Sequence, residues 1–281
     1  MRVQDLTSLR YSRAESARFG LRVFRAELDA VDAGVLVEAL KRDRVDVAIL
    51  RLPADAIASI NELREYGFAP IVADTIVRYD IDLPAPRADL DEAVSLRDAT
   101  PADAPLLESL AREIFAGYVT HYHANPLFPA SKILDGYGEW AASHVSSERA
   151  GSAAWLVEMC GEIAGFSCYR LDTERAEAFG VLNGVLPSMR RQGVYRAMLR
   201  RMFRDFAVRG MGHFAIATQV QNVSVQRIWA AEGLSLRRTD NTVHINALFG
   251  RAQESFDDGS AASRAAHRAA GVHASEADGS K

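Results

Sequence analysis

The segment from Val185 to Arg196 carries residue types that suit phosphate binding. An apolar run ends at Pro187, a short basic loop follows, and a helix is predicted to begin at Gly193. A helix N-terminus presents unpaired backbone N–H groups and the positive end of the helix dipole, and glycine lets a ligand approach the backbone closely. Positive charge is added by Arg190, Arg191 and Arg196. This pattern favours a phosphate or pyrophosphate site, with a purely structural helix cap as the alternative.

The elements around this segment follow a regular order. We predict a strand over 94–97, a helix that starts at Thr100-Pro101-Ala102-Asp103, a hairpin of 153–159 and 163–171, a strand over 177–186, a helix over 193–209, a strand over 214–218, a helix over 224–232, and a strand over 242–248 after a turn at Thr239-Asp240-Asn241. The basic loop therefore connects a buried strand to an amphipathic helix.

In this setting, Arg190-x-x-Gly193-x-Tyr195 resembles the R/Q-x-x-G-x-G/A pyrophosphate loop of the GNAT superfamily of acyl-CoA-dependent N-acyltransferases. The order of elements over 92–250 resembles theirs, and Asn222 with the stretch 228–234 resembles the second half of their motif set. The resemblance implies an α/β (α+β) protein with the GNAT fold, in which helices flank a central mixed, twisted sheet. It also implies acetyl-CoA or another acyl-CoA as co-substrate and no metal.

The resemblance further implies a set of residues that bind the acyl-CoA. Backbone N–H groups near Val185 or Leu186 would stabilise the oxyanion of the tetrahedral intermediate. Asn222 would hydrogen-bond the pantetheine arm or a water, or else serve only as a helix-start residue. Trp229 would line the CoA site or pack in the core. The full set is Val185, Leu186, Arg190, Arg191, Gln192, Gly193, Val194, Tyr195, Arg196, Asn222 and Trp229.

The chain departs from the family pattern at two positions. The last glycine or alanine of the loop is Tyr195, whose side chain must point away from a bound pyrophosphate. Trp229 stands where many members have a tyrosine that protonates the departing CoA thiolate. An indole is a donor only and does not ionise usefully, so Trp229 cannot act as a general acid.

Direct attack of an amine on the thioester, which the resemblance implies, needs a base for the ammonium proton. His121, His123 or His244 can serve, because imidazole titrates near neutral pH, and so can a chain of waters. His121 and His123 would share a face of an extended loop, and with Asn222 they are the candidate catalytic residues. The alternatives are half of a metal site, which no further cluster completes, and two solvated loop residues.

A closer resemblance is to dTDP-fucosamine acetyltransferase-like sugar-nucleotide N-acyltransferases. These also carry an N-terminal β/α extension, with matches at 16–21 and at 65–68. Their acceptor-side loop and the helix after it would correspond to Tyr122, Asn125, Tyr137 and Trp140, which we therefore expect to bind the acceptor.

The region before residue 83 is predicted to hold a β-α-β-α-β arrangement, with strands over 21–28, 45–52 and 68–81 and helices over 35–41 and 54–66. Two prolines mark a linker, and the end of the chain has almost no large apolar side chains. The expected domains are a GNAT-like half domain over 1–82, a linker over 83–91, the acyltransferase domain over 92–250, and a disordered tail over 251–281.

Composition limits the function classes. Of the 281 residues, 33 are Lys or Arg and 37 are Asp or Glu, for a formal charge of −4, and 48% are hydrophobic. These values are typical of a soluble globular chain, and the balance of charges argues against a nucleic-acid partner. Because charges interrupt every apolar stretch near Met1, we expect no signal peptide, no membrane partner and a cytoplasmic location. The two cysteines, Cys160 and Cys168, are expected to be small buried side chains. The sequence leaves a homodimer open as a further partner.

Three functions remain open from the sequence. The first is acyl transfer to an amine, such as the amino group of a nucleotide-linked deoxyamino sugar. The second keeps that chemistry and changes the acceptor to another small amine or a protein N-terminus. The third is a non-catalytic module that binds CoA or a partner protein, which Trp229 favours.

Overall fold

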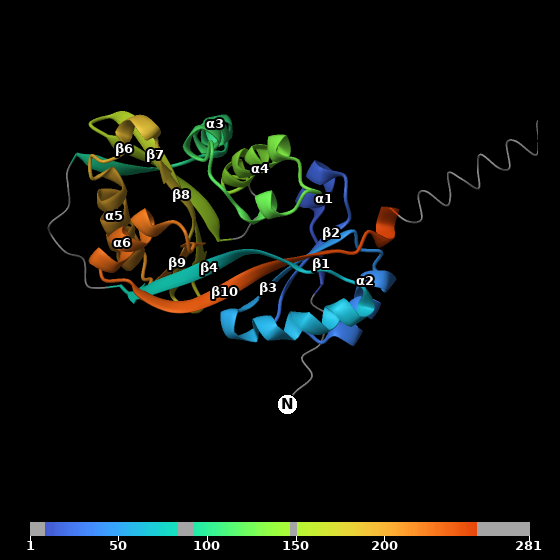
Figure 1. Cartoon of the computed structure of the whole chain (residues 1–281). Helices are drawn as coiled ribbons and strands as arrows, with labels where there is room; N and C mark the ends of the chain where they lie inside the picture. The colour runs from blue at the N-terminus through green and yellow to red at the C-terminus, as the bar shows by residue number, and fades with distance from the viewer. Residues whose placement is uncertain (1–8, 84–92, 147–150, 252–281) are drawn as a thin grey trace, which may run out of the picture. The chain divides into compact units, whose positions relative to one another are not determined.

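The computed structural model of the chain describes residues 9–83, 93–146 and 151–251 (Figure 1). Two compact units are each assembled from segments that are separated in sequence. The first takes in the residues up to Arg51, Ala58–Ile71 and the residues from His244 on, and the second takes in Leu52–Ile57 and Val72–Val243. The boundaries of these units differ from those of the expected domains, and the expected domains stay a prediction. The predicted linker and tail lie outside the described residues except for Leu83 and Arg251.

The first unit contains a small sheet in which β2 pairs with β1 in antiparallel and with β3 in parallel orientation. Its elements are β1 (Arg10–Tyr11), α1 (Arg13–Phe19), β2 (Val23–Glu27), α2 (Ala33–Arg42), β3 (Val47–Pro53) and the 3₁₀ helix η1 (Ala54–Tyr66), of which the last residues of β3 and the first of η1 fall in the second unit. The parallel pair is connected through α2, whose Leu36, Val37 and Leu40 are buried. The predicted strand, helix and strand are confirmed, whereas β1 and α1 were not expected from the sequence.

The predicted helix over 54–66 forms as a 3₁₀ helix rather than an α-helix. Its apolar residues Ile57, Ile60 and Leu63 are three apart, which is the repeat of a 3₁₀ helix, and the last two are buried. The helix ends before Gly67, which has a φ of 84°, a left-handed conformation that glycine adopts without a steric penalty.

The second unit is built on a mixed sheet in the order β10-β4-β9-β8-β7-β6-β5. Its strands are β4 (Ile71–Asp82), β5 (Val94–Asp98), β6 (Ser152–Met159), β7 (Glu162–Asp172), β8 (Glu177–Val185), β9 (His213–Gln219) and β10 (Ser235–Asn246), the last of which ends in the first unit. Its helices are α3 (Ala104–Ile114), α4 (Ala130–Ala142), α5 (Val194–Val208) and α6 (Val223–Ala231), with 3₁₀ turns η2 (Pro101–Asp103), η3 (His121–Ala124) and η4 (Pro187–Met189). The pair β8–β9 is parallel, while β4–β9, β5–β6, β6–β7 and β7–β8 are antiparallel.

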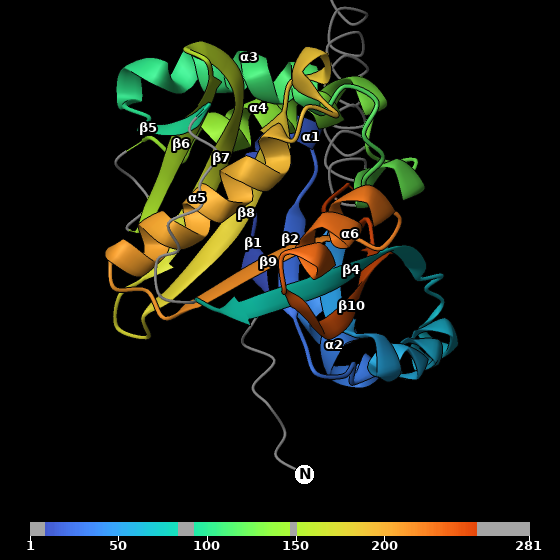
Figure 2. The ribbon, with the colours of Figure 1, turned by 90° about the vertical axis from the view of Figure 1, so that its left-hand side faces the viewer.

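Both faces of this sheet are covered by helices. Along β6, Trp155 and Val157 join the core beneath α5 and α6, whereas Ala154 and Leu156 join the core beneath α3 and α4. This alternation follows from the two-residue period of a strand. Figure 2 shows α5 crossing the strands diagonally on one face. The arrangement confirms the predicted mixed sheet flanked by helices.

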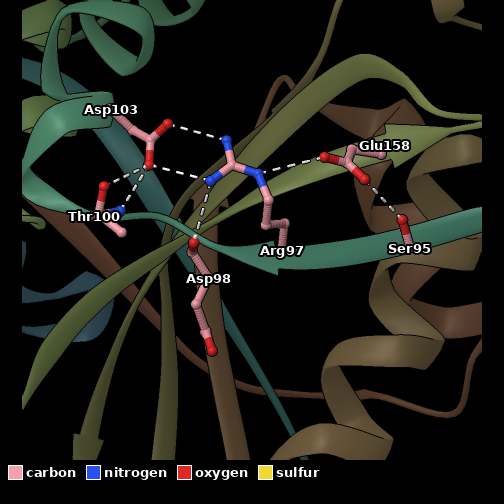
Figure 3. A network of polar contacts seen from close by, with 6 residues as sticks. All are labelled: Ser95, Arg97, Asp98, Thr100, Asp103 and Glu158. Carbon is pink, nitrogen blue, oxygen red and sulfur yellow. Dashed lines mark hydrogen bonds and ion pairs between the residues drawn. The ribbon is translucent and has the colours of Figure 1, made fainter.

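The start of α3 follows the predicted signals. Thr100 and Asp103 form a capping box, in which the Asp103 carboxylate accepts from the Thr100 backbone N–H at 2.8 Å. Figure 3 shows that Arg97 bridges Asp103 and Glu158, so it ties this helix start to β5 and β6. The Arg97 guanidinium and the Thr100 hydrogen bonds hold the pKa of Asp103 well below its usual range.

The hairpin of β6 and β7 also follows the sequence. Met159 pairs with Glu162, and the two residues between them, Cys160 and Gly161, have φ values of 52° and 86°. Positive φ at both central positions is the geometry of a type I′ turn. Cys160 is exposed at this turn and Cys168 is buried, so the expectation of a small buried side chain holds for Cys168 alone.

The predicted turn at Thr239-Asp240-Asn241 is wrong, because β10 continues through these residues. Their polar side chains are held within the sheet rather than at a turn. Asp240 is fully buried and pairs with Arg78 at 2.6 Å, and the Asn241 side chain accepts from Thr75 at 2.8 Å. Both partners lie on β4, the neighbour of β10, so cross-strand hydrogen bonding overrides the local turn preference.

Candidate functional site

The parallel strands β8 and β9 part before they end. Their pairing stops at Gly180 and Ile216, although β8 continues to Val185 and β9 to Gln219. At the same point, Tyr169 of β7 pairs with Gly180 and Cys168 pairs with Leu182, so Val181 is an extra, unpaired residue in β8. A β-bulge of this kind bends its strand. Both strands lead into helices, so the N-termini of α5 and α6 lie at the edge where the strands separate.

Backbone groups of β8 are directed into this opening. The Leu186 N–H donates to Ala164 O at 2.8 Å and thereby pairs with β7. In an antiparallel pair, neighbouring residues alternate in the direction of their backbone groups, so the N–H of Val185 faces the side from which β9 has parted. Of the two expected oxyanion donors, Leu186 is therefore engaged in the sheet and Val185 faces the opening.

The loop between β8 and α5 has the backbone of an anion-binding turn. Arg191 and Gly193 both have positive φ, 64° and 81°, and the residues 191–193 are exposed. A Cβ added at Gly193 would meet open space rather than protein atoms. Left-handed residues ahead of a helix turn successive N–H groups toward one concave surface, and the 15-residue helix α5 adds its positive dipole end. The strained φ of Arg191 marks the loop as held in place by its surroundings.

The three arginines at the loop differ in what they contact. The Arg190 guanidinium donates to Ile114 O at 3.0 Å and to Val185 O at 3.4 Å, so it joins the end of α3 to the loop. Arg196 pairs with Glu232 at 3.1 Å. Arg191 is exposed beside Gly193, and it is the arginine whose surroundings best suit a phosphate ligand. Gln192 donates to Ser188 O at 3.1 Å across the loop.

Tyr195 and Trp229, the two residues that differ from the motifs this sequence resembles, contact each other. Trp229 Nε1 donates to Tyr195 Oη at 3.2 Å, and the Trp229 ring, which is 1% exposed, meets Tyr79 edge-on with 5.4 Å between ring centroids. The Tyr195 ring packs partly buried in the same core as Trp229, and Val194 before it is buried. Burial raises the pKa of Tyr195 above its usual range. The expectation that this side chain turns away from the loop surface agrees with its packing.

A polar cluster lies at the end of β9. Asn222 Nδ2 donates to Thr218 Oγ1 at 3.0 Å, and the Tyr118 hydroxyl contacts Thr218 at 3.4 Å and donates to Gln219 Oε1. The Asn222 side chain does not cap α6, so its amide serves this cluster instead. Burial raises the pKa of Tyr118. Tyr118 was not found by sequence reasoning, because its partners are about 100 residues away along the chain.

Of the three candidate bases, His121 and His123 lie on the 3₁₀ turn η3 and His244 lies on β10. The expected extended loop is therefore wrong, and the two loop histidines do not share a face, because His121 is buried and His123 is exposed. His123 Nδ1 lies 3.1 Å from the Thr120 backbone N and 3.3 Å from both Thr120 O and Thr120 Oγ1, so this ring nitrogen packs against the residue that precedes η3. His121 is buried, 7% exposed, and its ring lies against Tyr122 at 3.9 Å between centroids. His244 belongs to the first compact unit; burial, together with the charge of Arg25, lowers its pKa to about 4.

The residues expected to bind the acceptor lie on η3 and α4. Tyr137 stacks on Phe115 at 4.7 Å, meets Tyr118 at 6.3 Å and approaches Trp140 at 6.2 Å. Trp140 is partly exposed, whereas Asn125 is buried and accepts from Leu127 N–H at 3.1 Å. Tyr137 thus connects the predicted acceptor side to the polar cluster through Tyr118. Within the described ranges, no three His, Cys, Asp or Glu side chains converge as a metal site would require.

The sequence matches no protein-family model and no curated protein. Solved structures do share its fold. A GCN5-related N-acetyltransferase from Sphaerobacter thermophilus is 13% identical, with a TM-score of 0.55 over 79% of this chain and 72% of that one. A GCN5-related N-acetyltransferase from Kribbella flavida is 16% identical, with a TM-score of 0.51 over 79% and 80%. A functionally unknown conserved protein from Staphylococcus epidermidis is 11% identical, with a TM-score of 0.54 over 88% and 94%. The chain therefore has the GNAT fold.

Proposed function

We propose that this protein is an N-acyltransferase that moves an acetyl or other acyl group from acyl-CoA to an amine. The observation that carries the proposal is the parting of β8 and β9 beside the loop of Arg191 and Gly193. An extended, amide-bearing chain such as pantetheine can add to the exposed side of β8, while its pyrophosphate meets the N-terminus of α5. An acyl-CoA molecule contains both groups, a pantetheine chain and a pyrophosphate.

The residues of the opening then have distinct roles. The N–H of Val185 faces the opening, where it can stabilise the oxyanion that forms on the thioester carbonyl. Asn222 and Tyr118 make the hydrogen bonds of the polar cluster at the end of β9. The base in this proposal is one of the two histidines of η3, His121 or His123. The remaining loop residues, Leu186, Gln192, Val194 and Tyr195, shape the CoA site.

The acceptor proposal concerns the aromatic residues of η3 and α4. Of the expected acceptor residues, Tyr137 and Trp140 lie with their rings 6.2 Å apart, Tyr137 is 6.3 Å from Tyr118 of the polar cluster, and Trp140 is exposed, so this aromatic pair suits an acceptor with a flat or ring-shaped body. Tyr122 and the buried Asn125 belong to the neighbouring loop at η3. We propose the amino group of a nucleotide-linked deoxyamino sugar as the acceptor and the cytoplasm as the place of reaction. Among the described residues, no helix has the length and apolar character needed to span a bilayer.

The test is CoA thiol release from acetyl-CoA with a panel of amines that includes dTDP-amino sugars, other small amines and a peptide N-terminus, against a control without acceptor. Acceptor-dependent release that is strongest for the amino sugars supports the full proposal. Release with other amines alone keeps the transferase and excludes the sugar acceptor. Calorimetry with acetyl-CoA covers the remaining case, because binding without turnover would identify the non-catalytic module.

A further inference from the structure

Asn183 is a polar residue on the part of β8 that borders the opening. The pairing of β8 with β9 ends at Gly180, before Asn183 is reached. On the other side of the strand, Asn183 pairs with Ser167 of β7. Its neighbours Leu182 and Gly184 are buried, whereas Asn183 is partly exposed. The strand therefore carries a partly accessible amide beside the place where β9 has parted.

The Asn183 side chain is oriented by Ser167. Ser167 is fully buried, and its Oγ lies 2.5 Å from Asn183 Oδ1 and 3.4 Å from Met202 Sδ of α5. A separation of 2.5 Å fits an O–H···O hydrogen bond and is too short for N–H···O, so the Ser167 hydroxyl donates and the amide oxygen accepts. The amide oxygen thus faces β7, with α5 above it, and the amide nitrogen faces the side of the opening.

The amide nitrogen of Asn183 offers its N–H groups to a ligand. Among the residues that the structure describes, Nδ2 has no hydrogen-bond partner in the protein. Because the side chain is partly exposed, water can satisfy these donors in the free protein. An alkyl group that displaced the water would leave them unpaired at a cost in free energy, whereas an oxygen atom would accept from them.

The acyl end of the donor is the part of acyl-CoA that comes nearest to Asn183. In the proposed function, the pyrophosphate lies at the loop before α5 and the pantetheine arm follows the exposed side of β8. Because β8 leads into that loop at its C-terminal end, an arm that starts there passes Val185 first and reaches Asn183 with its far end. That far end carries the thioester and the acyl chain.

We infer that Asn183 selects the acyl group, and that its amide donates to an oxygen on the acyl chain beyond the thioester. The inference rests on the proposed acyl transfer and names its donor class, an acyl-CoA whose chain bears a further oxygen, such as a 3-hydroxyacyl group. Alkyl chains of the same length are the disfavoured class. Ser167 is a positioning residue, because it holds the amide oxygen and thereby turns Nδ2 toward the opening.

The experiment compares two donors of the same size, 3-hydroxypropionyl-CoA and butyryl-CoA, which differ by a hydroxyl in place of a methyl group. The readout is kcat/KM for each donor with the best amine acceptor, and acetyl-CoA establishes that the enzyme turns over. Asn183→Leu keeps the approximate volume of the side chain and removes its donors, and Ser167→Ala removes the partner of the amide oxygen. Tyr169→Phe is the matched control, because it also removes a hydroxyl from β7, one that accepts from Arg209.

The wild type should prefer 3-hydroxypropionyl-CoA to butyryl-CoA by about tenfold, which corresponds to about one hydrogen bond. Asn183→Leu should lose or reverse this preference, and Ser167→Ala should reduce it. Tyr169→Phe should keep it within about twofold. The wild-type preference tests the inference even where a variant does not fold.

Two results overturn this inference alone. One is a wild type that transfers acetyl groups but uses the two longer donors equally or prefers butyryl-CoA, and the other is an intact preference in a folded Asn183→Leu. An unchanged preference in Ser167→Ala overturns the positioning role of Ser167. If the wild type transfers none of the three acyl groups to any amine, the proposed function and this inference are overturned together.

Discussion

Trp229 Nε1 donates a hydrogen bond to Tyr195 Oη at 3.2 Å, and these two residues occupy the two positions at which the chain departs from the GNAT motifs it resembles. The two departures are therefore complementary. A tyrosine in place of glycine or alanine brings a polar group into the core beside α6, and a tryptophan in place of tyrosine supplies the donor that satisfies it. A buried phenol without such a partner would be costly, so one change accommodates the other.

The first prediction separates the indole N–H from the indole ring. Trp229→Phe keeps an aromatic side chain against Tyr79 and removes the donor to Tyr195. We expect the free energy of unfolding to fall by about 1–3 kcal/mol, since the buried Tyr195 hydroxyl loses its donor. The measurement is urea unfolding, and Tyr195→Phe/Trp229→Phe, which removes both polar groups, should be less destabilised than the sum of the two single variants. Strict additivity of the two single losses would contradict a stabilising contact between these residues.

The second prediction concerns the left-handed backbone of Gly193. Gly193→Ala places a Cβ where a ligand would lie, and Gly210→Ala is its matched control at the other end of α5. The two glycines have nearly equal φ, 81° and 83°, and neither Cβ would meet a protein atom within 4 Å. We expect both variants to lose about 1 kcal/mol of stability.

Only Gly193→Ala is expected to weaken acetyl-CoA binding, by at least about fivefold, because its Cβ lies at the loop surface. Chemical unfolding measures the loss of stability that both variants share, and calorimetry measures the loss of acetyl-CoA affinity that is expected for Gly193→Ala alone. Equal Kd values for the two variants would contradict the assignment of this loop to the phosphates.

The third prediction distinguishes the neighbouring arginines of the loop. Arg190→Ala removes hydrogen bonds to Ile114 O and Val185 O, so the free energy of unfolding should fall by about 1–2 kcal/mol. Arg191→Ala removes an exposed charge and should change stability by less than about 0.5 kcal/mol. Instead, it should raise the Kd of acetyl-CoA and weaken the dependence of that Kd on salt, because one charge contact to phosphate is lost. Urea unfolding and a salt series of binding isotherms test the pair, and a reversed pattern would reverse the two roles.

The fourth prediction addresses the loop histidines. One of the two variants His121→Ala and His123→Ala should lower kcat about 100-fold, as expected for the loss of a general base. The other should change kcat by less than about threefold. The measurement is kcat from pH 5.5 to 9 for both variants. Unchanged rates in both would remove the two histidines from the mechanism and leave water as the proton acceptor.

The sequence predicted what depends on local chemistry and missed what depends on distant partners. The capping box of Thr100 and Asp103, the turn at Cys160 and Gly161, and the end of the helix at Gly67 all follow from residues within a few positions. By contrast, Asp240 and Asn241 have the composition of a turn and lie within a strand, since Arg78 and Thr75 hold them from β4. Local propensity carries no information about such partners.

The same limit applies to the candidate site. The loop of Arg190 to Gly193 was found from its residues, but the contact of Arg190 with Ile114, 76 residues away, could not be. Tyr118 was missed for this reason as well, since Gln219 is 101 residues away. The Tyr195–Trp229 pair was visible only as two separate exceptions to a motif, and its hydrogen bond needed the packing of α5 against α6.

The last prediction concerns His244, which is buried at the end of β10 in the first compact unit, with Arg25 and Glu15 close enough to influence its charge. Burial and the charge of Arg25 lower its pKa from 6.5 to about 4, so the folded chain favours the neutral ring. A lowered pKa in a base means that the stability is fully present above about pH 6.5 and is lost as the pH falls toward 4. From these two pKa values, the loss at pH 5 is about 2 kcal/mol. Urea unfolding of the wild type and of His244→Gln, which cannot titrate, should therefore give a stability difference that shifts by about that amount toward the variant between pH 7.5 and pH 5. The same difference at both pH values would contradict the buried, neutral state of His244.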